Sequence, residues 1–147
     1  MAFRIQIHPN QLVACGSAHL GFSPVPEKLG REFNPEDHDL DFAVISAELF
    51  CNWWSELQGA GLVADVRDKV SRDLFWGLID PAKVCDLTVH GSRWLEAFSG
   101  IQTTEARSVS GRLYRSFWSM ENIHRQAIVL GRAKLLQERE VCIGQKP

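Results

Sequence analysis

The sequence predicts a mainly α-helical fold: a single-domain bundle of about four helices with a small N-terminal β-hairpin and a Pro/Gly-rich loop. In four long stretches, apolar residues recur every three or four positions, as they do on the buried face of a helix. Proline follows an Asn or Asp cap at two predicted helix starts. The 147 residues are 45% hydrophobic and 23% charged, which suits one domain spanning 1–147 around one core.

The N-terminal segment has the alternation of a strand. Phe3, Ile5 and Ile7 are separated by polar residues, and a turn-like Pro-Asn pair precedes a second short apolar run. We therefore predict a β-hairpin over residues 1–15. Residues 16–34 hold five prolines and glycines, a density that breaks helices, and are predicted to be a loop over the body.

Residues 35–143 are predicted to form the helical bundle. Gly59 and Gly61 separate the first two helices, and Asp80 with the following proline is typical of a helix start. Gly91 interrupts the third helix, so we expect a close approach of another segment or a break at that position. The four predicted helices cover about 35–58, 62–78, 80–99 and 112–140.

Charge is divided along the chain. Residues 1–100 hold 14 acidic and 8 basic side chains, whereas residues 101–147 hold 4 acidic and 8 basic. No apolar run is long enough for a membrane span, and no export signal is visible, so we predict a cytoplasmic protein with no membrane association. The four cysteines form no close pair, which argues against zinc and favours free thiols; no metal or cofactor is predicted.

The predicted function rests on an acidic patch. No sequence motif of the common enzyme classes is present, so an enzyme is the less favoured interpretation. We predict a small interaction or regulatory protein of the inhibitor, immunity or adaptor type, as found in bacteria and phage. Its patch would attract a basic partner surface electrostatically. The predicted partner-binding residues are Glu36, Asp37, Asp39 and Asp41.

The same segment partly resembles a calcium-binding loop. The alternating acids Asp37, Asp39 and Asp41 resemble part of an EF-hand loop, in which carboxylates alternate around the ion. The resemblance fails at Phe42, because that loop needs glycine at its sixth position. Acidic residues at a predicted helix start also have a simpler explanation in the helix dipole, so no metal ligands are assigned.

Two alternative functions stay open. One is a small helical enzyme or nucleic-acid-acting protein that uses the 15–41 loop as its site. Its candidate residues are His19, Arg31, His38 and Asp39. This alternative requires that they meet in one pocket.

The other alternative is nucleic-acid binding through the basic C-terminal helix. Tyr114 and Trp118 lie between its cations, and aromatic rings beside guanidinium groups suit single-stranded nucleic acid. The sequence pI near 6.2 argues against it. The residues of this predicted face are Arg112, Arg115, Arg125 and Arg132.

Overall fold

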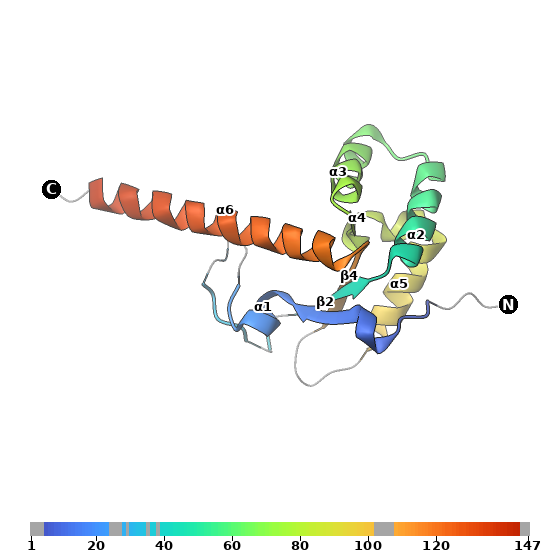
Figure 1. The fold of residues 1–147 in the computed structure, drawn as a ribbon, viewed down its shortest axis with the longest axis horizontal. Helices are drawn as coiled ribbons and strands as arrows, with labels where there is room; N and C mark the ends of the chain where they lie inside the picture. The colour runs from blue at the N-terminus through green and yellow to red at the C-terminus, as the bar shows by residue number, and fades with distance from the viewer. Residues whose placement is uncertain are drawn as a thin grey trace.

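The protein is mainly helical, as predicted, but its helices are arranged around a four-stranded sheet (Figure 1). The computed structural model describes residues 5–23, 28, 30–34, 36, 37, 39–101 and 108–144, with side chains omitted at 135 and 138–144. No helix in these ranges is both long enough and apolar enough to cross a membrane.

The sheet is mixed. Its strands lie in the order β1-β2-β4-β3: the central pair β2 and β4 is parallel, and each outer strand is antiparallel to its neighbour. Parallel pairing requires a long crossover, and here the helices between residues 47 and 99 supply it. The strands are β1 (Leu12–Cys15), β2 (Leu40–Ile45), β3 (Leu78–Ile79) and β4 (Val109–Tyr114).

The helices begin where the sequence offers side-chain caps. The Ser46 hydroxyl accepts a hydrogen bond from the Leu49 amide at 3.2 Å, and the Thr88 hydroxyl accepts one from the Gly91 amide at 3.0 Å. The helical elements are η1 (Pro9–Gln11), α1 (Gly16–Leu20), α2 (Ala47–Gly59), α3 (Ala64–Phe75), α4 (Pro81–Val84), η3 (Cys85–Leu87), α5 (Val89–Ser99) and α6 (Phe117–Gly144).

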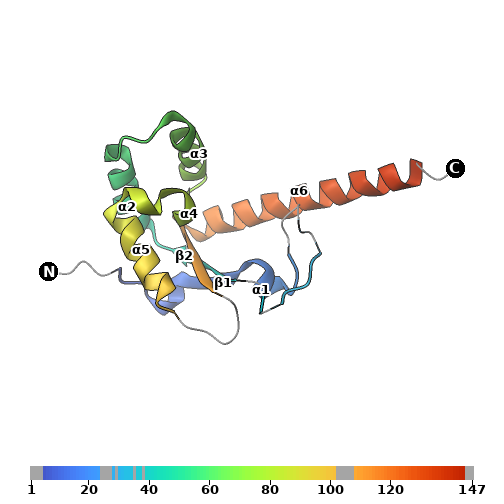
Figure 2. The same ribbon diagram turned by 180° about the vertical axis from the view of Figure 1, so that it is seen from behind.

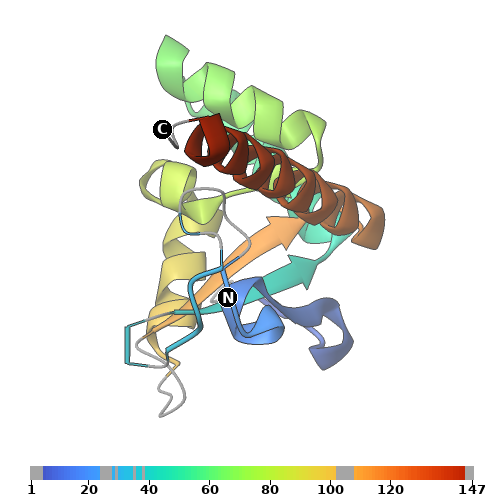
Figure 3. The same cartoon turned by 90° about the vertical axis from the view of Figure 1, so that its left-hand side faces the viewer.

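The sheet separates two apolar cores. On one face, α2, α3 and α5 pack on Val44 and Leu113. The layer is filled by the aromatic residues Trp53, Trp94 and Phe98, of which Trp94 and Phe98 are stacked. A smaller core on the other face lies under the first turns of α6 (Figure 3). It consists of Cys15, Ala43, Ile45 and Tyr114, with Met120 and Ile123 packed against them. The rest of α6 extends beyond the sheet (Figures 1 and 2).

The predicted N-terminal hairpin is wrong. Residues 5–8 form no strand, and β1 pairs with β2 instead, with Leu12 opposite Val44. Residues 1–4 lie outside the described part of the chain. The predicted loop 16–34 contains the short helix α1, and Phe22 forms an isolated antiparallel bridge with Glu32. The first strand therefore gains its stability from the sheet rather than from a local turn.

Two predicted helices have strands at their N-terminal ends. The first, predicted over 35–58, contains a turn at Glu36–Asp37 and strand β2 from Leu40 to Ile45, and becomes helix only at Ala47. The last, predicted over 112–140, overlaps strand β4 before α6 begins at Phe117. The last three residues of β2 are all buried, and β4 ends with buried Leu113 and Tyr114, so neither segment shows the clear period-two alternation of a half-exposed strand.

The two middle helices are shorter than predicted. The helix predicted over 62–78 ends at Phe75, and the one predicted over 80–99 divides into α4, η3 and α5. At Gly91 the expected close approach is present: a Cβ there would collide with the backbone of Cys85. The break in that helix therefore lies just before Gly91, where η3 folds back onto α5.

Candidate functional site

Asp39 and Asp41 lie where strands β2 and β4 begin side by side. In the parallel register of β2 and β4, Asp41 is opposite Ser110. Asp39 and Ser108, which immediately precede the two strands, continue this register. The Ser108 hydroxyl donates to Oδ1 of Asp39 at 2.6 Å, and the Ser110 hydroxyl donates to Oδ1 of Asp41 at 2.6 Å. Bonds this short to charged acceptors hold both carboxylates in place.

Gly16 brings a third segment to the same place. It has a φ of 69°, and a Cβ built on it would lie 2.8 Å from Oδ2 of Asp41. Glycine at the end of β1 therefore satisfies both the left-handed backbone and the close approach of the carboxylate. The Cys15 thiol also donates to the Asp41 carbonyl oxygen at 3.4 Å. Asp41 is thus the point where β1, β2 and β4 converge.

Arg112 supplies positive charge beside this point. It lies two residues after Ser110 on β4, so its side chain leaves the same face of the sheet. Burial alone lowers the pKa of Arg112, but the negative charges of nearby groups, Asp80 and Asp41 among them, oppose this effect, and the pKa lies above its ordinary value. The guanidinium is therefore a permanent cation among acidic neighbours.

The titratable groups beneath α6 are held neutral. Burial, with a smaller contribution from Asp41, raises the pKa of Cys15 to about 11, and burial raises the pKa of Tyr114 to about 12. Burial and the nearby Arg112 lower the pKa of His124, whose Nε2 lies 3.4 Å from the Tyr114 hydroxyl oxygen. A protonated thiol is a poor nucleophile, so Cys15 fits a packing role.

A cavity of about 200 Å³ lies beside the aspartates, between the β1–α1 segment and α6. Gly16 and Cys15 form its border toward Asp41, and Leu20, Met120 and His124 contribute much of its wall. It is a mainly apolar space, and two of its lining residues, Cys15 and Gly16, lie against Asp41. Pockets for small ligands commonly combine an apolar lining with a few polar groups.

The four predicted acidic residues lie in two kinds of surroundings. Glu36 and Asp37 lie in an exposed turn, where the Asn34 side-chain amide donates to Oδ2 of Asp37 at 3.1 Å. Asp39 and Asp41 instead belong to the serine-bound cluster at the sheet, and Asp41 is only half exposed. Glu36, Asp37 and Asp39 are thus exposed, and Asp39 and Asp41 are in addition held by serine hydroxyls.

The four predicted arginines do not share a helix face. Arg112 is in strand β4, and Arg115 follows it with its Cζ 6.0 Å from the centroid of the Phe50 ring. Arg125 and Arg132 are exposed on α6. The structure thus places the predicted nucleic-acid face in at least three separate environments.

The residues of the alternative enzyme site are only partly brought together. His19 is exposed but lines the 200 Å³ cavity beside Gly16. Arg31 is also exposed and immediately precedes Glu32, the residue that pairs with Phe22. His38 lies outside the described residues. Asp39 is in the cluster. Among the described candidates, His19 alone lines the cavity, and neither Asp39 nor Arg31 belongs to its lining.

Sequence analysis missed the residues that define this cluster. Gly16, Ser108 and Ser110 carry no motif, and the serines lie 69 residues after the aspartates they contact. The only local signal was the Asp-Leu-Asp spacing itself, which places both acids on one face when read as a strand. No group of three or more His, Cys, Asp or Glu side chains suited to a metal occurs in the described part of the chain.

A scan of family models, a search of curated proteins and a search of solved structures found no match to this chain.

Proposed function

We propose that this protein binds the magnesium complex of a phosphorylated substrate, such as a nucleoside triphosphate, and acts in phosphoryl-group transfer. The observation that supports this proposal is the pair Asp39 and Asp41, fixed by hydroxyls from β4. This function refines the alternative in which the 15–41 segment forms an enzyme site.

The chemistry of the pair suits Mg²⁺. Two residues along a strand separate the two aspartates by about 6.6 Å on the same side. Magnesium in proteins is commonly bound by one or two carboxylates, with substrate phosphates and water completing its octahedron. A dedicated cage of three or more protein ligands is therefore not required, which departs from the sequence-based prediction of no metal.

In this proposal, the two carboxylate oxygens of each aspartate have different roles. Oδ1 accepts the serine hydroxyl, and Oδ2 has no hydrogen-bond partner within the described residues. Oδ2 would contact the metal, while the Ser–Oδ1 bond fixes the direction of the carboxylate. Second contacts of this kind tune and orient metal ligands.

The surroundings supply what a phosphorylated ligand needs besides the metal. The positive charge of Arg112 lies near Asp41 and would stabilise negative charge that develops on a transferring phosphoryl group. Gly16 has no side chain, which lets the chain at the start of α1 approach a ligand closely. The adjoining 200 Å³ cavity would take the uncharged part of the substrate, such as a base.

Titration calorimetry with Mg·ATP tests the proposal. Wild-type protein should bind Mg·ATP, whereas Asp41→Asn and Asp39→Asn should each weaken binding at least tenfold and abolish its dependence on Mg²⁺. Glu36→Gln is the matched control, because it removes an exposed acid from the neighbouring turn and should leave binding unchanged. Equal loss in the control variant, or no binding by wild type with ATP, GTP, CTP or UTP, would contradict the proposal.

Binding of a basic protein partner remains a second proposal, supported by the exposure of the acidic residues Glu36 and Asp37 in their turn. A basic protein partner attracted by that turn would bind less tightly to Glu36→Gln and Asp37→Asn, and its association would slow with added salt. The same variants thus separate the two functions: the turn acids matter for a partner, and the serine-bound acids matter for magnesium.

A further inference from the structure

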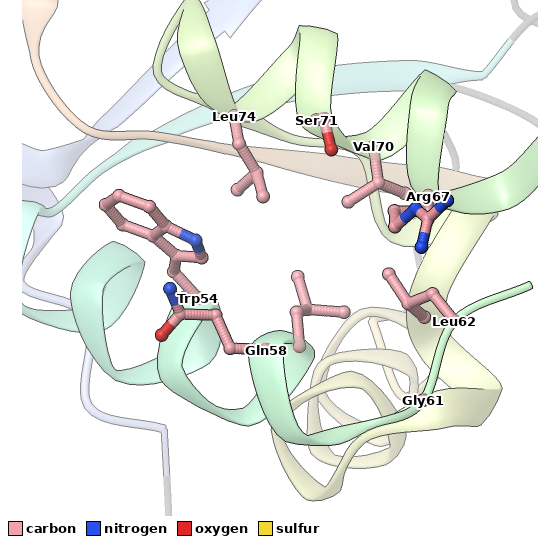
Figure 4. A pocket seen from close by; sticks show the side chains of 9 residues that line it. Trp54, Gln58, Gly61, Leu62, Arg67, Val70, Ser71 and Leu74 are labelled. Atoms are coloured by element: carbon pink, nitrogen blue, oxygen red, sulfur yellow. The ribbon is translucent and has the colours of Figure 1, made fainter. Parts of the chain in front are cut away.

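A second cavity, of about 390 Å³, lies between α2 and α3 (Figure 4). The larger core separates it from the Asp39–Asp41 cluster on the opposite face of the sheet. Its inner wall is apolar: Leu57 and Val70 are 3% and 5% exposed, and Leu74 lies beside them. A volume of this size lies within the range of small-molecule sites, roughly 300–1,000 Å³.

The two ends of this cavity differ in chemistry. At one end, Trp54 from α2 faces Leu74 from α3; at the other end, Arg67 lies beside Leu62 (Figure 4). The Trp54 indole is 39% exposed, and its orientation is fixed by an edge contact with Phe50, with centroids 6.3 Å apart at 61°. One end therefore offers a flat aromatic face and the other a cation.

Arg67 is available to a ligand. No carboxylate in the described part of the chain forms an ion pair with it. Its guanidinium lies along the rim of an apolar space, where a charge-assisted, two-point contact with a planar anion is strongest. The Gln58 amide and the Ser71 hydroxyl line the same cavity and add uncharged hydrogen-bonding groups, the Gln58 amide lying beside Trp54 (Figure 4).

We propose that this cavity binds a small aryl carboxylate, with its ring on Trp54 and its carboxylate on Arg67. The seven residues from Arg67 to Leu74 span about 10.5 Å along α3, which sets the length of ligand that reaches both ends. A single guanidinium matches the single charge of a carboxylate. The apolar wall between the ends matches an uncharged ring system, and the site is independent of the proposed magnesium function.

The test compares naphthalene-2-acetic acid with its neutral amide, naphthalene-2-acetamide. The indole N–H resonance of Trp54, assigned with Trp54→Phe, reports binding in NMR titrations of the full chain. The acid should shift this resonance saturably, and the amide should bind at least tenfold more weakly. Equal affinities of acid and amide, or a shift confined to other tryptophans, would overturn the proposal.

Two arginine variants locate the charge. Arg67→Gln should reduce the affinity for the acid to that for the amide, whereas Arg72→Gln should leave the tenfold preference intact. Arg72 is an exposed residue of the same helix that does not line the cavity, so the two variants change net charge equally. An undiminished preference in Arg67→Gln, with both variants folded by circular dichroism, would also overturn the proposal.

Discussion

Replacing Gly16 with alanine tests the close approach between Gly16 and the Asp41 carboxylate. Gly16 has a φ of 69°, and alanine in the left-handed region costs roughly 1–2 kcal/mol. The new Cβ would also lie 2.8 Å from Oδ2 of Asp41, so the carboxylate must move, and we expect that movement to break the bond between its Oδ1 and Ser110. A hydrogen bond to a charged group contributes about 1.5–3 kcal/mol, and that contribution adds to the backbone cost.

Gly21 provides the matched control. It lies at the other end of α1 with a φ of 78°, and no atom lies within 4 Å of the position of its Cβ. Gly21→Ala therefore carries the backbone cost alone. We expect Gly16→Ala to lower the free energy of unfolding by about 1.5–3 kcal/mol more than Gly21→Ala does.

Urea unfolding followed by tryptophan fluorescence measures both variants, and a double-mutant cycle identifies the cause. In an Asp41→Ala background the carboxylate is absent, so the excess cost of Gly16→Ala should disappear. Equal losses for Gly16→Ala and Gly21→Ala in the wild-type background would refute the close approach of Asp41. An excess that persists without Asp41 would refute its assignment to that carboxylate.

Three further predictions concern the two cores. Burial lowers the folded-state pKa of His124, so the unfolded state takes up more protons than the folded state as the pH falls. The free energy of unfolding should therefore decline from pH 7.5 to 5.5. His124→Gln should flatten that decline when stability is measured by urea unfolding at each pH. At pH 8, Ellman's reagent should label exposed Cys51 rapidly and buried Cys15, whose pKa is about 11, much more slowly. Peptide mapping distinguishes the two sites, and equal rates would contradict the packing of Cys15. Trp53 is fully buried and donates its indole N–H to Thr88 at 2.8 Å, so Trp53→Ala should cost about 3–5 kcal/mol in thermal or urea unfolding, and a loss below 1 kcal/mol would contradict its central position.

The helical part of the fold was predictable because its signals are local. Gly59 and Asp80 mark helix boundaries through a break and a cap within a few residues of sequence, whereas the cap at Ser46 lies inside the first predicted helix and was missed. The strands were hidden for the opposite reason. Phe42 and Ile45 fit a helical spacing with Leu49, and nothing local shows that this segment pairs with β4, some 69 residues away.

The candidate site was predicted only in part. Asp39 and Asp41 were identified as functional acids, but they were grouped with Glu36 and Asp37 because all four were read as the surface of one helix start. Assigning β2 as a strand separates the two pairs. The serines that position the aspartates cannot be found from spacing, since their contacts arise from the parallel pairing of distant strands.

The most direct test of the magnesium proposal replaces the metal with Mn²⁺, whose unpaired electrons broaden nearby NMR signals. In the presence of a non-hydrolysable ATP analogue, broadening should be strongest at the amides of Gly16, Asp41 and Ser110, and it should disappear in Asp41→Asn. Strongest broadening at Glu36 and Asp37 that persists in Asp41→Asn, or no localised broadening at all, would contradict the account.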